Sequence, residues 1–292
     1  MPRWLAWPTA SSDPTLAGGN RLGMPELPET ETIARDLHEL VVGQSIRGVS
    51  IIRHDVLRGG DGRAVGRALK GRTIEGVTRR AKTVVLGLSG GRYMLVTPRF
   101  TGSLQVTEPD AYGTLVLALD DGRKLVYRDV RRLGTVQVVD QAGFDAFDAR
   151  LGVEPLSPTF TSDHLSGILR SSSAAIKKTL MEQRRIAGVG NIYANEALWL
   201  ARIDPSRSAR RVAPDLTAAL RNELVALLEA AIAERGTTFR DYRDARNERG
   251  RFAARLQAYG RGGQPCTRCG THLAETWAID GRSTVFCFRC QG

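Results

Sequence analysis

The sequence lacks the features of a membrane or secreted protein. No stretch of 18 apolar residues occurs, which excludes a membrane-spanning helix. Residues 1–23 lack the charged start and apolar centre of a signal peptide. Cysteine is absent from the first 265 residues, and all four cysteines fall in the last 27. A disulfide framework spread over a secreted domain is therefore excluded, and we expect a cytoplasmic protein.

Acidic residues are also in deficit. The chain has 31 Asp and Glu against 42 Lys and Arg, which gives a net charge of +11 and a pI near 10.1. Such an excess favours a polyanionic partner, and nucleic acid is the leading candidate. The 292 residues are enough for two modest domains and a small appendage.

The chain begins with a segment in which apolar residues show no regular spacing, and it continues with short runs typical of β-strands. Residues 1–23 are rich in Pro, Gly, Ser and Thr without a sustained period, so we interpret them as a disordered extension or a mis-assigned start. Helical spacing of apolar residues predicts one helix over 27–42. Eight predicted strands follow, at 45–52, 73–79, 83–88, 93–97, 103–107, 114–119, 124–128 and 135–139.

The second half has a helical pattern and a cysteine-rich end. Helices are predicted at 143–151, 161–170, 174–184, 191–201 and 214–234. The sequence thus predicts an α+β, multi-domain protein with an N-terminal β-sandwich and a C-terminal helical domain. The predicted units are a β-sandwich domain at 25–140, a helical domain at 141–258 and a four-cysteine finger at 259–292.

The stretch MPELPETE at 24–31 has two interpretations. In the first, it is only a helix entrance, because Pro28 suits a first helical position. In the second, Met24 is the initiator and is removed, which leaves Pro25 as a secondary amine at a free N-terminus. Only a free amine is a nucleophile, and Glu26 beside it is a carboxylate able to move protons.

The stretch 175–200 predicts two helices joined by a glycine turn. The first helix is expected to end near Arg185 and the second to open at Asn191 as its N-cap. The free backbone N–H groups of that start, with Asn191 and Lys177, form a predicted phosphate-sized anion site. The alternative is an ordinary helical hairpin. The basic residues Lys178, Arg184 and Arg185 favour the anion site.

The four cysteines form two CxxC pairs separated by 17 residues. This spacing predicts one tetrahedral, structural zinc ion with no open position for a reacting water. The zinc ligands are Cys266, Cys269, Cys287 and Cys290. Between the pairs, strands at 271–279 and 283–286 predict a β-hairpin finger with Arg282 near its tip. Arg282 either contacts a DNA backbone or is simply solvated.

From Met24 to Gly292 the chain resembles the formamidopyrimidine-DNA glycosylase and endonuclease VIII family of base-excision repair enzymes. The start PEL, rather than PEG, favours the formamidopyrimidine branch. The matching motifs, in the family's order, are PELPETE, RRAK ending at Lys82, TGSL at 101–104, DVRRLG at 129–134, AIK ending at Lys177, GVGNIYANE at 188–196, LQAYGRGGQPC, and DGR with the four cysteines. The resemblance implies the sandwich, a helix-two-turn-helix domain and the zinc finger.

The resemblance also implies a chemistry. Pro25 would attack the deoxyribose C1′ of a flipped damaged nucleotide and expel its base, while Glu26 would protonate the opening sugar ring. The covalent iminium then permits elimination of the 3′ and the 5′ phosphate. Lys82, Asn191 and Arg282 would hold the phosphates around the lesion.

Four further residues have implied roles. Arg131 matches the arginine that contacts the base left unpaired, and Phe100 and Leu133 fall where wedge side chains fill the vacated stack. Glu29 matches a residue that helps to line the lesion pocket.

The sequence departs from the family pattern in three places. Methionine is common where Phe100 stands and phenylalanine where Leu133 stands, so the wedge is partly exchanged. Histidines expected near Thr97 and near 112–114 are absent. The segment 241–251, which covers the damaged base in some relatives, is unusually charged.

Three functions remain open. The first is a DNA glycosylase and abasic-site lyase that removes oxidised purines, namely 8-oxoguanine and ring-opened formamidopyrimidines. The second is the same chemistry on oxidised pyrimidines, as in endonuclease VIII. The third is a non-catalytic damaged-DNA-binding protein, if residues 1–23 are retained and block Pro25. In each case the partner is double-stranded DNA with a damaged base or an abasic site, and we expect a monomer.

Overall fold

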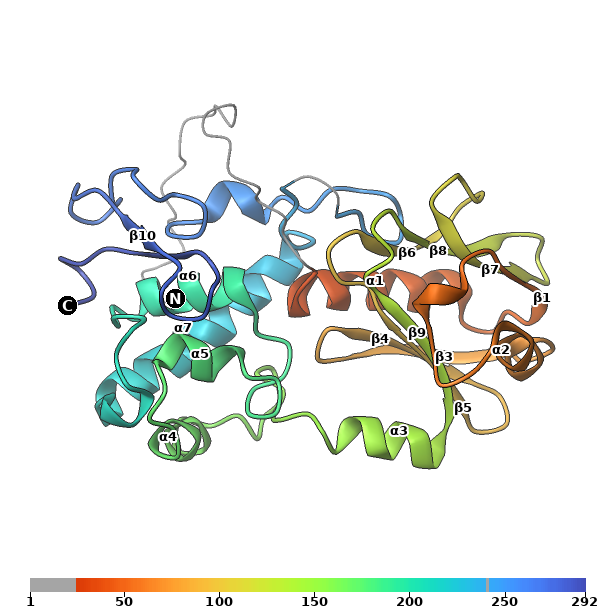
Figure 1. Cartoon of the computed structure of the whole chain (residues 1–292), viewed down its shortest axis with the longest axis horizontal. Helices are drawn as coiled ribbons and strands as arrows, with labels where there is room; N and C mark the ends of the chain where they lie inside the picture. The colour runs from red at the N-terminus through yellow and green to blue at the C-terminus, as the bar shows by residue number, and fades with distance from the viewer. Residues whose placement is uncertain (1–24, 240–241) are drawn as a thin grey trace.

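The computed structural model describes residues 25–239 and 242–292. The predicted extension 1–23 lies outside these residues. Figure 1 shows a β-rich part and a helical part that carries the finger, with helix α1 (Leu27–Val41) reaching from one to the other. Among the described residues, no helix has the length and apolarity needed to cross a membrane.

Helix α1 belongs to two hydrophobic cores. Its first residue, Leu27, packs in the core of the helical part, whereas Ile33, Leu37 and Val41 pack in the core of the β-rich part. The helix ends just before Gly43, whose φ of +88° suits a glycine. Because one rigid helix enters both cores, the residues before Leu27 are placed at the junction of the two parts.

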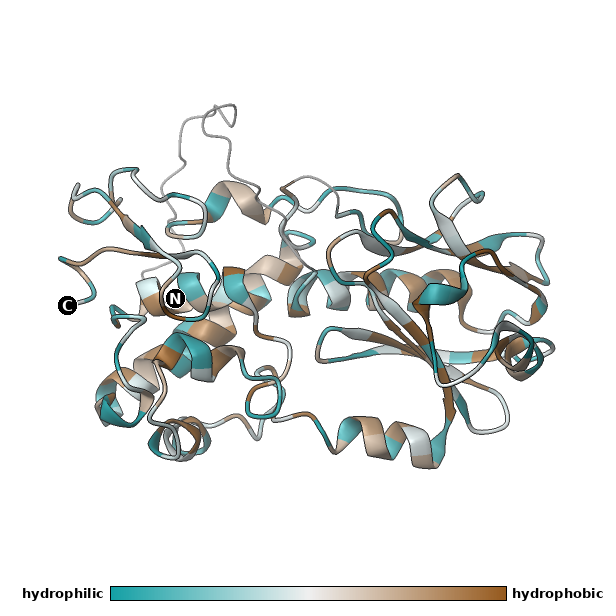
Figure 2. Ribbon diagram, in the orientation of Figure 1, coloured by the Kyte–Doolittle hydropathy of each residue, from teal (hydrophilic) through white to brown (hydrophobic). Residues whose placement is uncertain are grey.

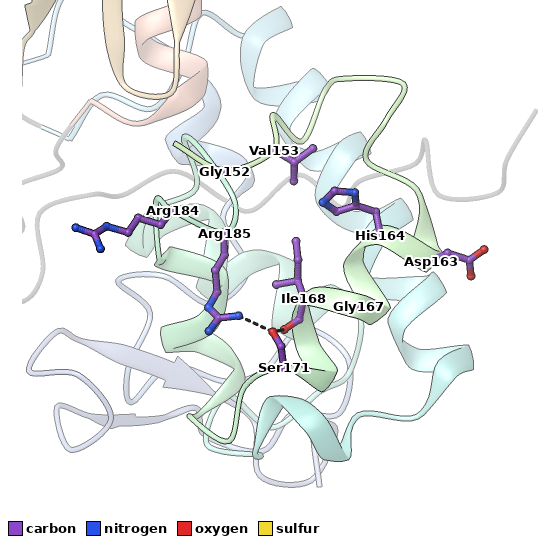
Figure 3. Close-up of a pocket in the computed structure, with 9 residues that line it drawn as sticks. All are labelled: Gly152, Val153, Asp163, His164, Gly167, Ile168, Ser171, Arg184 and Arg185. Carbon is purple, nitrogen blue, oxygen red and sulfur yellow. Dashed lines mark hydrogen bonds between the residues drawn. The ribbon is translucent and has the colours of Figure 1, made fainter. Parts of the chain in front are cut away.

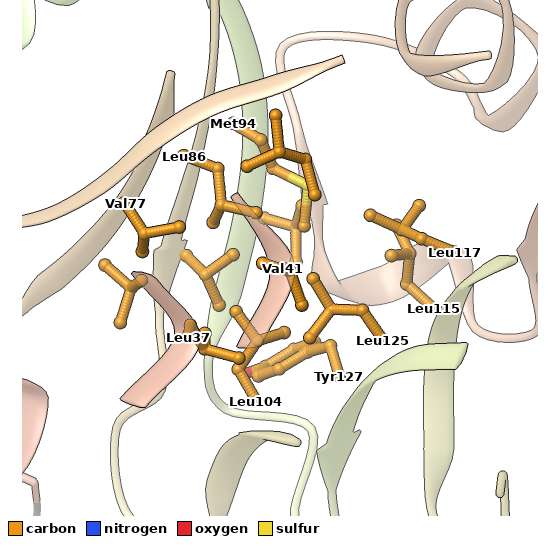
Figure 4. Close-up of a cluster of buried hydrophobic side chains, with 14 of the residues drawn as sticks. Leu37, Val41, Val77, Leu86, Met94, Leu104, Leu115, Leu117, Leu125 and Tyr127 are labelled. Carbon is orange, nitrogen blue, oxygen red and sulfur yellow. The ribbon is translucent and has the colours of Figure 1, made fainter. Parts of the chain in front are cut away.

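The β-rich part is the predicted sandwich. Its sheets have the strand orders β1-β7-β8-β6 and β2-β9-β5-β4-β3. The strands are β1 (Ile46–Ile51), β2 (Leu57–Arg58), β3 (Ile74–Arg80), β4 (Thr83–Leu88), β5 (Arg92–Thr97), β6 (Gly102–Val106), β7 (Gly113–Leu119), β8 (Lys124–Asp129) and β9 (Thr135–Asp140). Figure 4 shows side chains of α1 packed with those of both sheets. The strands are largely apolar and several connecting loops are polar (Figure 2).

All eight predicted strands are confirmed within two residues at each end. The structure adds the two-residue strand β2, the short turn η1 (His54–Val56) and helix α2 (Gly62–Leu69), which the sequence analysis missed. Strand β2 and turn η1 are too short for an apolar period to stand out, and α2 buries only Val65 and Leu69. Asp61 is the N-cap of α2, and its side chain accepts a hydrogen bond from Ala64 N.

The five predicted helices are also present. They are α3 (Gln141–Asp148), α4 (Ser162–Arg170), α5 (Ile176–Met181), α6 (Asn191–Leu200) and α7 (Pro214–Ala233), with short turns η2 (Ala209–Arg211) and η3 (Phe252–Arg255). Helix α3 contacts β5 and β9 rather than the helical core. Its Phe144 stacks on Tyr93 at 4.6 Å between ring centroids. The predicted domain boundary at residue 141 therefore precedes a helix that packs on the sandwich.

Helix α5 is shorter than predicted. It ends at Met181, not near Arg185, because the following residues pair with another segment. Gly152 N donates to Gln183 O and Val153 N donates to Arg185 O, at 2.8 and 3.2 Å. Helices α5 and α6, with the turn between them, form the helix-two-turn-helix unit.

The finger is a small hairpin of β10 (Ala274–Thr276) and β11 (Thr284–Phe286). Its first strand ends three residues earlier than predicted, because Gly281 N donates to Trp277 O at 3.0 Å and closes a turn there. Its small core packs on Trp199 of α6. The hairpin is therefore fixed to the second helix of the helix-two-turn-helix unit.

Candidate active site and DNA-binding surface

Three distant segments meet at Gly190, the residue before α6. A Cβ on Gly190 would lie 2.4 Å from Glu26 Oε1 and 2.4 Å from Lys82 Nζ, so only glycine leaves room for both side chains. Glu26 comes from the start of α1 and Lys82 from the turn between β3 and β4. The fold therefore brings together the two charged residues predicted at the reaction centre.

The predicted N-cap of α6 is wrong. The N-cap is Gly190, and Asn191 is the first helical residue. The carboxylate of Glu26 takes the place of a local cap, because Ile192 N and Tyr193 N donate to its two oxygens at 3.0 and 3.5 Å. The anion at this helix start is thus the side chain of Glu26, the N-cap of α1.

The residues at the start of α1 are fixed to the glycine turn. Leu27 N donates to Gly188 O at 3.1 Å, and Gly188 has a φ of +85°. A Cβ there would lie 2.8 Å from Leu27 Cβ. Pro25 lies two residues earlier and is buried. The turn therefore sets the position of Pro25 beside Glu26.

Burial changes the acidity of both charged residues at this centre. It raises the pKa of Glu26, against the opposing effects of the Lys82 charge and the α6 N–H groups. Burial lowers the pKa of Lys82; Glu26 opposes that effect, whereas Arg282 adds to it. Glu26 therefore holds a proton to a higher pH than an ordinary carboxyl group does, which suits a proton donor.

Glu29 connects the start of α1 to two other segments. Its carboxylate accepts hydrogen bonds from Tyr193 Oη, Thr237 N and Glu26 N, at 2.5, 2.7 and 2.8 Å. Burial, together with the charge of Glu26, raises its pKa to about 7. The sequence analysis missed Tyr193 and Thr237. Tyr193 lies inside the GVGNIYANE motif, whereas nothing in the sequence singles out Thr237.

Lys177 and Asn191 contact the finger. Lys177 is fully buried, and its Nζ donates to Thr284 Oγ1 at 2.7 Å and to Ser283 O at 3.1 Å. Asn191 Nδ2 donates to the same Ser283 carbonyl at 3.1 Å. Both residues thus hold the finger loop in place. Their binding of DNA stays a prediction.

Arg282 is exposed on the finger loop. Its side chain is 56% exposed, and its nearest acidic atom is Asp280 Oδ2 at 3.7 Å. Its charge contributes to the lowered pKa of both Lys82 and Lys177, so these three cations share one region. Such a region suits phosphate groups.

The predicted wedge residues come from two neighbouring turns. Phe100 lies in the turn between β5 and β6 and is half-buried, whereas Arg131 and Leu133 lie in the turn between β8 and β9 and are exposed. Arg131 N donates to Thr101 Oγ1 at 2.9 Å, which places the two turns side by side. The structure therefore groups all three residues on one edge of the sandwich.

The described part of the charged segment, residues 242–251, folds against the sandwich. Asp244 is fully buried and accepts a hydrogen bond from Arg235 Nε at 2.6 Å, and Arg235 also pairs with Asp36 of α1 at 2.5 Å. Tyr242 Oη donates to Glu29 O at 3.1 Å. The charges in the described part of this segment thus anchor it to α1.

The four cysteines form a structural zinc site. Their Sγ atoms all lie within 4.8 Å of one another, and Cys269 Sγ is 3.5 Å from Cys287 Sγ. Four thiolates about 2.3 Å from a tetrahedral zinc ion would be roughly 3.8 Å apart, so the arrangement fits the metal. All four positions are taken by protein, and the ion stabilises the finger.

One surface pocket lies elsewhere. It has a volume of about 540 Å³ and lies between α4 and the turn after α5. Figure 3 shows Arg185 at its wall, hydrogen-bonded to Ser171. Arg184 and Arg185, which the sequence analysis counted in favour of the anion site, line this pocket instead, and none of the residues predicted for catalysis, DNA binding or zinc does.

Comparison with known proteins agrees with this architecture. Residues 24–136 match the formamidopyrimidine-DNA glycosylase N-terminal domain, residues 151–243 match the H2TH domain of the same family, and residues 263–292 match the zinc finger found in FPG and IleRS. Together these matches cover most of the chain.

Individual proteins are similar over nearly their whole length. The formamidopyrimidine-DNA glycosylases of Chloroflexus aggregans and a Roseiflexus species are 41% and 42% identical, over 92% of this chain and 98% and 100% of theirs. The crystal structure of MutM (Fpg) from Thermus thermophilus has a TM-score of 0.83 at 36% identity, over 92% of this chain and 99% of that one.

A Lactococcus lactis Fpg in complex with DNA containing an abasic site has a TM-score of 0.84 at 29% identity, over 91% of this chain and 99% of that one. The domain order, the zinc site and the convergence at Gly190 point the same way. The chain belongs to the formamidopyrimidine-DNA glycosylase family.

Proposed function

We propose that this protein is a bifunctional base-excision repair enzyme, a DNA glycosylase with abasic-site lyase activity that removes oxidised purines from double-stranded DNA. The observation that carries the proposal is the meeting of Glu26 and Lys82 at Gly190, next to Pro25. A secondary amine, a carboxyl group with a raised pKa and a cation in one buried place are the groups that an iminium mechanism needs.

The reaction would start at Pro25. Its nitrogen forms a bond to C1′ and gives up its proton, the N-glycosidic bond breaks, and the base leaves with its electron pair and takes up a proton. Glu26 gives its proton to the sugar-ring oxygen as the ring opens, which leaves an iminium between Pro25 and C1′. The iminium acidifies the adjacent carbon, so the 3′ phosphate and then the 5′ phosphate are eliminated and a one-nucleotide gap remains.

The remaining site residues would hold the DNA. Lys82 and Arg282, together with Asn191 at the start of α6, would bind the phosphates of a nucleotide turned out of its stack. Lys177 would act mainly through the finger loop that it supports. Glu29 would line the lesion pocket. We propose a monomer that acts in the bacterial cytoplasm, in keeping with its bacterial relatives.

We expect the active enzyme to begin at Pro25, because an acylated proline nitrogen cannot form an iminium. Intact mass and N-terminal sequencing of the purified active protein will test this. Retention of Leu22-Gly23-Met24 in active enzyme would rule out the mechanism.

Borohydride is expected to trap the enzyme covalently on DNA that holds a lesion or an abasic site. Pro25→Gly, which still has a free primary amine, should keep some trapping. The readout is a protein–DNA adduct on a denaturing gel. If wild-type protein binds such DNA tightly and gives no adduct, the non-catalytic damaged-DNA-binding function replaces the one proposed.

We expect Arg131 to favour cytosine opposite the lesion, because a guanidinium can satisfy the acceptors of cytosine but finds no equally good pair on adenine. A bidentate contact discriminates by about 1 to 3 kcal/mol, so excision opposite cytosine should exceed that opposite adenine by roughly 10-fold or more. Arg131→Ala should remove most of this preference. Single-turnover excision of 8-oxoguanine opposite each base measures it.

The same assay distinguishes excision of oxidised purines from excision of oxidised pyrimidines. Duplexes with 8-oxoguanine, ring-opened guanine or thymine glycol are compared side by side. A strong preference for thymine glycol, with no effect of the opposite base, would instead favour an oxidised-pyrimidine glycosylase of the endonuclease VIII type.

A further inference from the structure

We propose that the buried carboxylate of Asp129 is a positioning residue that holds the two wedge segments, 98–101 and 130–134, in one fixed arrangement. The proposal rests on the proposed function, since the wedge has a task only in DNA. Asp129 is 1% exposed. One of its oxygens accepts a hydrogen bond from Thr101 Oγ1 at 2.6 Å, and the other accepts one from Gly134 N at 2.7 Å.

Thr101 extends this link to Arg131. Its hydroxyl has one hydrogen, which it gives to Asp129, and its lone pair accepts the N–H of Arg131 at 2.9 Å. A continuous path of hydrogen bonds therefore runs from the second segment, at Arg131, through the first segment, at Thr101, to Asp129 and back to the second segment at Gly134. The segment 130–134 is therefore linked to the segment 98–101 near both of its ends, at Arg131 and at Gly134.

The backbone of both segments needs such support. Arg99 and Arg132 have φ values of +50° and +54°, a region that residues with a side chain adopt unfavourably. The segments also touch directly, since a Cβ on Gly134 would lie 2.7 Å from Thr97 O and 2.8 Å from Pro98 O. Surrounding hydrogen bonds must hold these turns in place, and the Asp129 carboxylate accepts two of them.

This arrangement has a consequence for the wedge. Phe100 sits next to Thr101, and Leu133 sits next to Gly134, so each apolar wedge residue adjoins a donor to Asp129. If the two segments move as one body, Phe100, Arg131 and Leu133 enter the base stack together without being ordered on binding. Loss of the link should therefore affect insertion and opposite-base selection rather than the chemistry at C1′.

Tyr127 offers a matched control. Its hydroxyl also donates to Asp129, at 3.2 Å, but it belongs to strand β8 and not to a wedge segment. If Asp129 only stabilised the sandwich, Tyr127→Phe and Thr101→Val would have equal effects, because each removes one donor of the same carboxylate. If Asp129 positions the wedge, only Thr101→Val should alter the wedge, and Thr101→Ser should restore it.

The first measurement does not depend on catalysis. A duplex carries a stable abasic-site analogue with the fluorescent base 2-aminopurine opposite it, and its emission rises when a wedge unstacks that base. Wild type, Thr101→Ser and Tyr127→Phe should give the full rise at saturation, whereas Thr101→Val and Asp129→Asn should lose most of it. Thermal unfolding of each variant is recorded alongside.

The second measurement is excision of 8-oxoguanine opposite cytosine and adenine. In Thr101→Val, the preference for cytosine should fall from roughly 10-fold or more to below about threefold, with strand cleavage at a preformed abasic site unchanged. Wild-type fluorescence and preference in Thr101→Val, equal losses in Tyr127→Phe, or no fluorescence rise in wild type would each overturn the proposal. Absence of excision by wild type, with a normal fluorescence pattern, would instead count against the proposed function alone.

Discussion

Glu26→Gln is expected to lower excision of 8-oxoguanine by about 10²- to 10⁴-fold, the range that a general acid typically contributes. Glutamine keeps the size of the side chain and an oxygen for the N–H of Ile192, which now donates to Glu26 Oε1 at 3.0 Å. It has no acidic proton for the sugar-ring oxygen. Single-turnover excision measures the loss, and a DNA-binding assay should show that affinity is retained.

Strand cleavage at a preformed abasic site should suffer less in this variant, because no base has to leave. The pH dependence gives an independent test. Burial raises the pKa of Glu26, so wild-type excision should fall as the pH rises and the acid loses its proton. This fall in rate at higher pH should be absent from the residual activity of Glu26→Gln.

The matched control is Glu75→Gln, which changes an exposed carboxylate of the same domain. It should excise at the wild-type rate. Full excision by Glu26→Gln would show that another group protonates the sugar, and Glu29, with a pKa raised to about 7, would be the next residue to test.

Cys287→Ser is expected to release the zinc ion and to abolish lesion-specific DNA binding. In zinc-finger peptides a structural zinc site contributes on the order of 10 kcal/mol of apparent folding free energy, so the finger should unfold when one thiolate is lost. Cys287 is fully buried in the finger core. Unfolding would also displace Ser283 and Thr284, the hydrogen-bond partners of Lys177.

Metal content by mass spectrometry should fall from one zinc per chain to none, while circular dichroism shows that the sandwich stays folded. Phe288→Ala is the control within the same CxxC pair, because its ring is exposed and all four thiolates remain. It should keep its zinc. A Cys287→Ser protein that lacks zinc and binds lesion DNA normally would contradict the DNA-binding role of Arg282.

The sequence by itself determined the features that depend on neighbouring residues. The helices follow from apolar residues spaced at 3.6 residues per turn, and the eight main strands follow from short apolar runs between turn residues, which each segment carries on its own. The paired CxxC spacing likewise predicted the zinc site, because each pair brings its two thiolates together locally. Motif order was enough to indicate the family.

Predictions from neighbouring residues were wrong where a segment is hydrogen-bonded to a residue far away in the chain. Helix α5 stops at Met181 because residues 183 and 185 bond to the segment at 152–153. Asn191 is not an N-cap, because the side chain of Glu26, the residue before α1, accepts the free N–H groups of the helix instead. In both places a long-range contact overrides a local preference that is worth only about 1 kcal/mol.

Only the tertiary structure decided the chemistry of the site. Glu26 and Ile192 are 166 residues apart in the chain, and Glu29 and Thr237 are 208 apart, yet each pair is hydrogen-bonded. The pKa of Glu26 is raised, and Lys177 is buried, because several packed elements together keep water away from these side chains. No single segment could exclude water alone. The sequence could name these residues as candidates, but acidity and position arise only when α1, the β3–β4 turn, α6 and the finger pack together.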